Sequence, residues 1–189
     1  RDRSLMSDFL EKILSHKRDE VEAAARLVPE ASLRREAGSA DRSGRRRLFD
    51  SLAVAGPRGM NVIAEVKRAS PSKGRIRDEV DPAHYARLYE KGGAAAISVL
   101  TDNAFFSGSP ADYRQARAAV KLPVLRKDFL ISSYQVYESA VMGADAVLLI
   151  VRALSPELLK DLLVLCSSLG LDALVEVHDE AEFEIAAVA

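Results

Sequence analysis

Three segments of the sequence repeat one junction, a glycine followed by small and branched apolar residues. They lie at residues 93–97, 143–147 and 170–174. A glycine at the C-terminal end of a helix supplies the left-handed turn into the next element. Repetition at roughly 25 to 35 residues is typical of βα units in a parallel sheet. The sequence therefore predicts an α/β fold whose strands are covered on both faces.

Five strands follow from these junctions and from the apolar runs. They are predicted at residues 61–67, 95–100, 122–127, 146–151 and 173–177. Helices are expected to begin at Asp81-Pro82, where aspartate caps the first turn and proline suits the first helical position, and again at Pro110. Gly92 and Gly93 are expected to end the first of these two helices.

The chain is expected to consist of a helical extension, residues 1–54, and a series of βα units, residues 55–189. The first residues carry charges without an apolar central region, so they do not form a secretory signal. Met6 is a candidate native start, which would make residues 1–5 a vector remnant.

The extension should begin with an amphipathic helix over residues 7–27, capped by Ser7 or Asp8. Pro29 interrupts this helix, and a short helix over residues 31–36 follows. A basic run comes next, with two interpretations open: a solvated loop, which we favour, or a flap that attracts an anionic substrate. Its members are Arg42, Arg45, Arg46 and Arg47.

Alternation inside the strands distinguishes a closed barrel from an open, doubly wound sheet. In the first strand Ile63, Glu65 and Lys67 share one face, because successive side chains of a strand point to opposite sides. The same face of the later strands carries Ala96 and Ser98, Leu125 and Lys127, Leu148 and Ile150, and Leu174 and Glu176. Polar groups at the C-terminal ends of several strands are typical of barrel active sites. We therefore expect the first five βα units of a (β/α)8 TIM barrel.

Four charged residues on these strands form the candidate active site: Glu65, Lys67, Lys127 and Glu176. An unpaired ion on a buried strand face costs several kcal/mol in effective terms, about 3 to 5 when its partner is lost. Two ammonium and two carboxylate groups at one barrel mouth neutralise one another and suit proton transfer. The alternative is a salt-bridge network without chemistry, and the matching positions on separate strands disfavour it.

Two further features suit an anionic substrate with a flat ring. Residues 70–74, which are rich in serine and glycine, follow the first strand, and such a loop can direct hydroxyl and N–H groups at an anion. Phe105, Phe106 and Phe129 follow the second and third strands, where aromatic side chains suit an apolar ring. An ordinary turn and loop packing on the barrel rim are the alternatives.

Composition excludes several classes of function. The formal net charge of -1 gives no field that would attract nucleic acid or an acidic membrane surface. Cys166 lies on an apolar helical stretch and is interpreted as a packing residue, and the absence of other cysteines suits a cytoplasmic location. His16, His84 and His178 lack the spacing of metal ligands, and we interpret none of them as catalytic.

Several segments resemble indole-3-glycerol phosphate synthases. They are residues 63–74 (IAEVKRASPSKG), 125–129 (LRKDF), 143–150 (GADAVLLI) and 174–178 (LVEVH). The resemblance implies a carboxy-lyase of tryptophan biosynthesis that needs no cofactor and no metal. Such an enzyme closes the indole ring of 1-(2-carboxyphenylamino)-1-deoxyribulose 5-phosphate with loss of carbon dioxide and water.

The resemblance also implies a role for each of the four charged residues. Lys127 would be the general acid that protonates the substrate carbonyl oxygen. Lys67 would hold the anthranilate carboxylate and is a candidate proton donor in a later step. Glu176 would handle the proton of dehydration, and Glu65 would orient and balance the lysines. The expected contacts with the phosphate, ring and ribulose are Ser70, Ser98, Phe106, Phe129 and Leu148.

The resemblance further implies three more strands, which would supply an Asn-Arg pair, a Glu-Ser-Gly segment and a Gly-Ser phosphate loop. A polypeptide ending at Ala189 would lack most of the residues that bind the substrate phosphate, so we expect it to have negligible synthase activity. We expect a longer chain to be monomeric, whereas the open sheet edges of a fragment would favour oligomers. An intact mass of 20.6 kDa would indicate the fragment.

Two other functions compete with the lyase. A phosphoribosyl anthranilate isomerase, a related phosphate-binding barrel, needs an acid/base pair that is typically Cys with Asp. No cysteine lies at a strand end of this sequence, which disfavours that class. An inactive half-barrel that serves as an assembly or folding module is the non-catalytic alternative, and it gives the paired lysines and glutamates no purpose.

Overall fold

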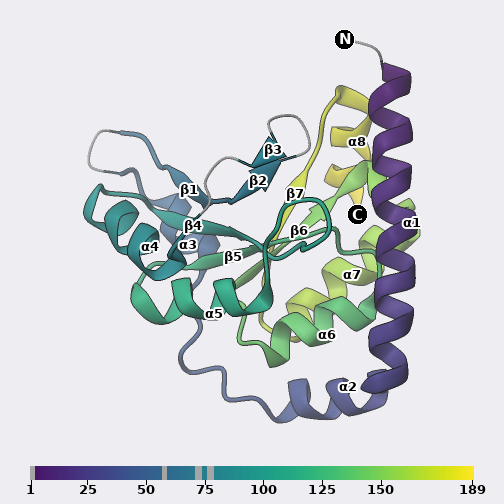
Figure 1. Ribbon diagram of the computed structural model, residues 1–189, viewed down its shortest axis with the longest axis horizontal. Coiled ribbons are helices and arrows are strands. Elements are labelled where there is room, and N and C mark those ends of the chain that lie inside the picture. Colours follow the sequence, from purple (N-terminus) through teal and green to yellow (C-terminus); the bar gives the residue numbers. More distant parts are fainter. Residues whose placement is uncertain (1–2, 57–58, 71–73, 76–78) are drawn as a thin grey trace. The chain divides into compact units, whose positions relative to one another are not determined.

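The computed structural model describes residues 3–56, 59–70, 74–75 and 79–189 (Figure 1). The main sheet has the strand order β1-β4-β5-β6-β7. Its strands are β1 (Ile63–Val66), β4 (Ala96–Leu100), β5 (Val124–Lys127), β6 (Ala146–Ile150) and β7 (Asp172–Glu176). The pairs β1/β4, β4/β5 and β5/β6 are parallel. The predicted α/β class and all five predicted strands are confirmed.

The chain divides into two compact units, which we name after their outermost strands. The β1 unit comprises Asp41–Asp128 and Met142–Val147. The β7 unit comprises Arg1–Ala40, Phe129–Val141 and Leu148–Ala189.

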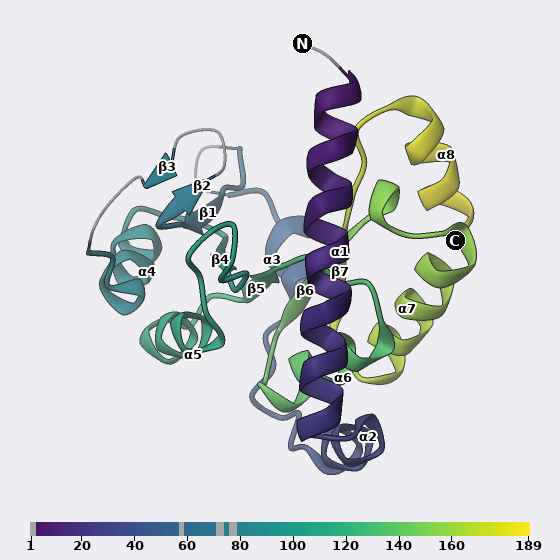
Figure 2. The ribbon, with the colours of Figure 1, turned by 45° about the vertical axis from the view of Figure 1, so that its right-hand side comes forward.

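In the β1 unit, helices pack against the strands and against each other. The helices are α3 (Leu48–Ala53), α4 (Pro82–Lys91) and α5 (Pro110–Ala119), and a small hairpin joins β2 (Ala69–Ser70) to β3 (Gly74–Arg75). Figure 2 shows α4 and α5 side by side. The core between these helices and the strands is apolar and fully buried, including Ile97, Val99, Val124 and Val147.

The predicted starts of α4 and α5 are confirmed. The Asp81 carboxylate accepts the backbone N–H groups of Ala83 and His84, and Pro82 occupies the first helical position. Ser109 caps α5 in the same way, because its hydroxyl accepts the N–H of Asp112. These side chains satisfy backbone donors that have no partner within the helix.

The β7 unit consists mainly of helices. They are α1 (Arg3–Leu27), α2 (Glu30–Ser39), α6 (Ser133–Val141), the short 3-10 helix η1 (Val151–Ala153), α7 (Pro156–Ser168) and α8 (Glu180–Val188). Both α1 and α2 pack against α6, and α7 packs against α6, β7 and α8. The Ser133 hydroxyl donates a hydrogen bond of 2.7 Å to Glu30, which links α6 to α2 (Figure 2).

Some details of the helices differ from the predictions. Helix α1 begins at Arg3, so Ser7 and Asp8 lie inside it and do not cap it. No proline or glycine precedes Ser7 to stop the helix there. The short helix α3 follows the basic run directly and was not predicted, because its start has no side-chain cap that could have signalled it.

The junction glycine and the buried cysteine behave as predicted. Gly93 has φ 87°, and Gly143 and Gly170 share this left-handed conformation, which favours glycine. Cys166 is 1% exposed on α7, and burial raises the pKa of its thiol to about 12, which confirms a packing role. Among the described residues, none of the helices combines the length and apolar composition that crossing a membrane requires.

Candidate active site

One carboxylate bridges two ammonium groups at the C-terminal ends of β1 and β5. Glu65 Oε1 lies 2.6 Å from Lys67 Nζ, and Glu65 Oε2 lies 2.9 Å from Lys127 Nζ. The structure thus brings together three of the four charged residues that the sequence singles out. We call these three residues the lysine cluster.

Strand register explains why these side chains meet. Glu65 is paired with Ser98, and Leu100 is paired with Lys127. Paired residues of neighbouring strands point to the same face, and so do residues two apart along one strand. Lys67 follows the last residue of β1 and is therefore level with Leu100 on that face. Alternation within the strands, which the sequence shows, is sufficient to place all three charges on one side.

The lysine cluster is partly shielded from solvent. The side chains of Glu65, Lys67 and Lys127 are 25%, 31% and 35% exposed. Burial alone would raise the pKa of Glu65, but hydrogen bonds and charges from the two lysines outweigh it and hold the pKa below its ordinary value. Glu65 is thus ionised at neutral pH and suited to holding the lysines, and two cations against one anion leave a positive charge for an anionic ligand.

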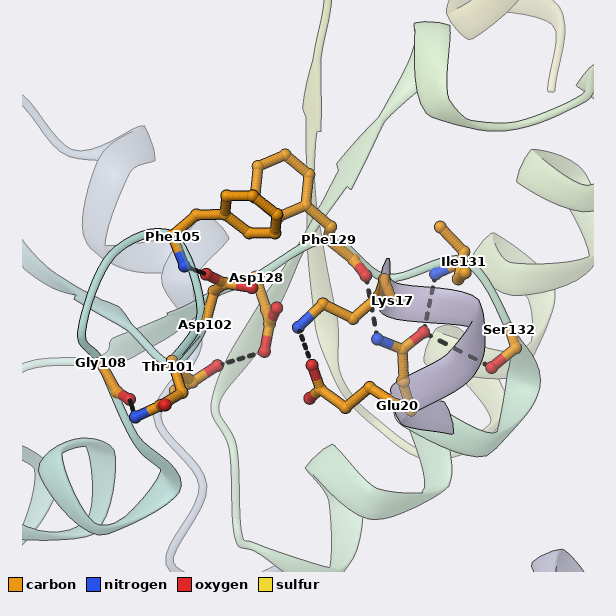
Figure 3. A network of polar contacts seen from close by, with 12 residues as sticks. Lys17, Glu20, Thr101, Asp102, Phe105, Gly108, Asp128, Phe129, Ile131 and Ser132 are labelled. Atoms are coloured by element: carbon orange, nitrogen blue, oxygen red, sulfur yellow. Dashed lines mark hydrogen bonds and ion pairs between the residues drawn. The ribbon is translucent and has the colours of Figure 1, made fainter. Parts of the chain in front are cut away.

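Buried hydrogen bonds hold the residues on either side of Lys127 in the β1 unit, and Figure 3 shows the one between Thr101 and Asp128. The Thr101 hydroxyl donates a hydrogen bond of 2.6 Å to Asp128, and Arg126 donates to Thr101 and Asp128 at 3.2 Å each. Arg126 and Asp128 are 4% and 3% exposed. This buried network holds the backbone on both sides of Lys127, and a rigid support is what a positioned acid requires.

Figure 3 also shows local bonds in two loops and one within helix α1. In the β1 unit, the Asp102 carboxylate accepts the N–H of Phe105 at 2.8 Å, which shapes the turn that carries Phe105 and Phe106. In the β7 unit, Lys17 Nζ lies 2.9 Å from Glu20, and the N–H of Ile131 donates to the Gln135 side chain at 2.8 Å.

A buried hydroxyl lies level with Glu65 on the next strand. Ser98 is 4% exposed, and its Oγ has no hydrogen-bond partner among the residues that the structure describes. A buried polar atom left unpaired costs about 1–3 kcal/mol. Such an atom beside a cationic cluster marks a position where a ligand group can complete the bonding.

The remaining predicted contacts are divided between the two units. Phe106 lies half-buried after β4, and Ser70 is 9% exposed in β2, both in the β1 unit. Phe129 and Leu148 belong to the β7 unit. Ser70 and Gly74 are paired strand residues, so the ends of the expected anion loop form a hairpin, and its residues 71–73 lie outside the described part of the chain.

The fourth charged residue, Glu176, belongs to the β7 unit and has its own partners there. Its Oε1 lies 3.1 Å from His178 Nε2, and His178 Nδ1 lies 3.3 Å from Glu182 Oε2. Glu182 is paired with Arg152 at 2.8 Å. Burial alone would raise the pKa of Glu182, but bonds from Arg152 and His178 lower it. Sequence reasoning missed the contacts of His178, because it tested histidines only for metal-ligand spacing.

Comparison with known proteins identifies the family. The model of the family described as indole-3-glycerol phosphate synthase matches residues 10–189. The chain belongs to the indole-3-glycerol phosphate synthase family. An indole-3-glycerol phosphate synthase of Syntrophobacter fumaroxidans is 59% identical over 184 residues, which cover 97% of this chain and 69% of the relative.

Other indole-3-glycerol phosphate synthases give the same picture. That of Desulfosudis oleivorans is 55% identical over 182 residues, which cover 96% of the chain and 68% of the relative. That of Aromatoleum aromaticum is 53% identical over 183 residues, with coverage of 96% and 69%. The family is one of lyases of tryptophan biosynthesis with a TIM-barrel fold. The five βα units of this chain are a part of that barrel.

A second network, absent from the predicted site, surrounds Asp145 where β6 begins. This carboxylate is buried and accepts the backbone N–H of Val124 at 3.0 Å and the guanidinium of Arg117 at 2.9 Å. It also accepts the backbone N–H of Arg46 at 3.1 Å, while the Arg46 side chain donates to the carbonyl of Leu122 at 2.9 Å. The interpretation of the basic run as a merely solvated loop is therefore wrong for Arg46, which anchors the run.

Within the described parts of the chain, no group of three His, Cys, Asp or Glu side chains is placed to hold a metal ion. The polar groups that gather near the lysine cluster are ammonium, carboxylate and hydroxyl groups. Ammonium groups bind anions and donate protons, and carboxylates accept them. The arrangement is suited to acid–base chemistry on an anionic molecule.

Proposed function

We propose that this chain carries the active site of an indole-3-glycerol phosphate synthase. Its substrate would be 1-(2-carboxyphenylamino)-1-deoxyribulose 5-phosphate, which becomes indole-3-glycerol phosphate with loss of carbon dioxide and water. The observation that carries the proposal is the Glu65 carboxylate bridging Lys67 and Lys127 in a member of this family. Its two cations suit a substrate with a carboxylate and a carbonyl oxygen that must be protonated.

Ring closure is assigned to the two lysines. The aromatic carbon that bears the carboxylate attacks the ketone carbon, and the carbonyl π electrons pass to oxygen, which takes a proton from Lys127. Lys67 holds the carboxylate until that group leaves as carbon dioxide, and its bonding electrons then restore the aromatic ring. Glu65 keeps both ammonium groups in place at 2.6 and 2.9 Å. A well-placed general acid contributes roughly a hundredfold or more in rate.

Dehydration completes the reaction, and Glu176 is assigned to it. The hydroxyl formed in the first step leaves as water, a neighbouring proton is lost, and the pyrrole ring becomes aromatic. Ser70 would contact the phosphate, and the other pocket contacts would be Ser98, Phe106, Phe129 and Leu148. The unpaired hydroxyl of Ser98 supports its place in that group. No metal or organic cofactor is required by this sequence of steps.

The length of the polypeptide decides how much activity to expect. The relatives named above are longer, since this chain covers 68% or 69% of them. Barrel phosphate sites usually lie after strands seven and eight. A polypeptide that ends at Ala189 is therefore proposed to be nearly inactive, and one that continues to the length of the relatives is proposed to be active.

The test combines intact mass with product detection. The sequence contains no tryptophan, so indole fluorescence that grows after substrate addition reports the product without indole emission from the protein. A protein of 20.6 kDa should give almost no signal, and a protein heavier by several kDa should turn over. A longer protein that forms no indole product would overturn the proposed function. Rapid turnover by the 20.6 kDa protein would overturn the proposed inactivity of the fragment.

A further inference from the structure

A line of four alternating charged and polar groups ends at Glu176. Arg152 of η1 pairs with Glu182 of α8, Glu182 contacts His178, and His178 contacts Glu176 at the end of β7. All four residues belong to the β7 unit. The Glu182 side chain is the least accessible of them, at 12% exposed, while Glu176 and His178 are each 34% exposed. The best-buried member, Glu182, thus lies between Arg152 and His178 and supports the more exposed pair His178 and Glu176.

The imidazole of His178 is engaged through both ring nitrogens. Glu182 Oε2 accepts the backbone N–H of His178 at 2.8 Å and also lies 3.3 Å from its Nδ1. The Asp179 side chain accepts the backbone N–H of Glu182 at 3.0 Å. This bond fixes Glu182 at the first turn of α8. These bonds set the orientation of the ring, and Nε2 is directed at Glu176 with a separation of 3.1 Å.

The acceptor role of Glu182 bears on how His178 meets Glu176. The lowered pKa of Glu182 keeps it an acceptor, so Nδ1 is the nitrogen that donates to it. His178 Nε2 and Glu176 Oε1 face each other across 3.1 Å, so a proton carried by either atom would join the ring to the carboxylate. The facing charged groups are Glu176, Glu182 and, behind Glu182, Arg152.

We propose that His178 is a positioning residue that holds the Glu176 carboxylate in place and in proton contact at the end of β7. The proposal rests on the proposed function, in which Glu176 transfers the proton of dehydration. A misplaced catalytic group can cost roughly a hundredfold in rate, and loss of one of several restraints costs less. In a protein of the relatives' length, we expect His178→Ala to lower kcat roughly tenfold and to leave KM nearly unchanged.

Two variants separate positioning from general loss of structure. His178→Gln retains a side chain that can donate to Glu176 and should recover part of the lost kcat. Glu182→Gln leaves His178 in place but removes the charge that orients its ring, so it should lower kcat by a smaller factor. His84→Gln is the matched control, because His84 is exposed on α4 and contacts Tyr85.

A spectroscopic measurement tests the contact without requiring turnover. In protein labelled with 15N-histidine, long-range proton–nitrogen spectra report the state of each ring nitrogen of His178. Glu176→Gln should shift Nε2 most and Glu182→Gln should shift Nδ1 most, whereas His84→Gln should leave both unchanged. If the signals of the His178 ring nitrogens are unchanged in both glutamate variants, the proposal is overturned.

The kinetic and spectroscopic results together distinguish the possible failures. Ring signals that respond as expected, with His178→Ala retaining the full kcat, would overturn the positioning role. If the ring signals respond but a protein of the relatives' length forms no product, the proposed function fails and the contact itself stands. A tenfold loss of kcat with partial recovery in His178→Gln and responding ring signals would support the proposal.

Discussion

The two ends of β5 and its neighbouring strands carry opposite kinds of polar network. Where β5 and β6 begin, the buried Asp145 carboxylate is surrounded by donors from Arg46, Arg117 and Val124. Where β1 and β5 end, Glu65 shares its two oxygens between Lys67 and Lys127 in a half-exposed position. In the first network the polar groups named here bond to one another. In the second, two ammonium groups share one carboxylate, which leaves a net positive charge that suits an anionic ligand. The first end is suited to stability, and the second is the one to which we assign the chemistry, as in other barrels.

Tyr113 strengthens this contrast at the Asp145 end. Its hydroxyl donates to the carbonyl of Val124 at 2.8 Å and accepts the N–H of Asp145 at 3.1 Å. Burial raises the pKa of Tyr113 far above the neutral range, so the group remains a donor under all ordinary conditions. Burial alone would lower the pKa of Arg117, but Asp145 outweighs it and raises that pKa. Neither Tyr113 nor Arg117 is therefore suited to exchanging protons near neutral pH.

The largest expected effect is on stability, from Asp145→Ala. It removes the acceptor of Arg117 and of two backbone N–H groups, and loss of one partner of a buried ion pair costs about 3 kcal/mol or more. The free energy of unfolding by urea measures this loss. Asp161→Ala, at an exposed position of α7, should change it by less than about 0.5 kcal/mol. Equal stabilities of the two variants would show that the Asp145 network is not structural.

The second effect is on the rate of product formation, from Lys127→Ala. We expect a loss of roughly a hundredfold or more, because the proposed general acid is removed. The stability of the fold should change little, since Lys127 is 35% exposed. Indole emission in a protein that turns over measures the rate, and Lys160→Ala at an exposed position of α7 is the matched control. A Lys127→Ala variant that is unstable but retains its full rate would contradict the account, because it would make the lysine cluster a structural network.

A smaller effect is expected from Ser98→Ala. Removing a buried hydroxyl without a partner should leave the free energy of unfolding unchanged or raise it by up to about 1 kcal/mol. The same change should raise KM, because the hydroxyl is proposed to bind the substrate. Urea unfolding and initial rates measure the two quantities. A clear loss of stability with an unchanged KM would assign Ser98 to the structural end of the molecule.

The smallest effect is the acid dependence that Glu65 contributes. Because its pKa is lowered by the two lysines, the unfolded chain binds more protons than the folded one as the pH falls below 4.5, and stability declines there. Above that pH the contribution is fully present. Glu65→Gln should remove it, so the stability difference between the two proteins should shrink in acid by about 1 kcal/mol or less. A difference that is constant from pH 7 to acid would contradict the lowered pKa.

The sequence predicts the lysine cluster because only short-range rules are involved. Alternation of side chains places Glu65 and Lys67 on one face, and glycine junctions with apolar runs locate the strands on which Ser98 and Lys127 lie. The resemblance to a family then assigns roles to these residues. The prediction placed four charges in one group: the structure brings Glu65, Lys67 and Lys127 together, and the place of Glu176 beside them stays a prediction.

The Asp145 network was beyond sequence reasoning for a physical reason. Its bond to the N–H of Arg46 joins residues 99 positions apart, and the other partners come from α5 and β5. No periodic pattern links such positions, and the basic run looked like any solvated loop. The contacts of His178 were missed for a different reason: His178 lies beyond the end of β7, in the short connection to α8, where no strand or helix period places its side chain.

The central claim is that Glu65 and Lys127 act as a unit, and a double-mutant cycle tests it most directly. Rates of indole formation are compared for Glu65→Gln, Lys127→Met and the double variant in a protein that turns over. We predict that the combined loss is smaller than the product of the single losses, with a coupling of about 1 kcal/mol or more. Single losses that multiply in full would mean that the carboxylate and the ammonium group act independently, and would contradict the account.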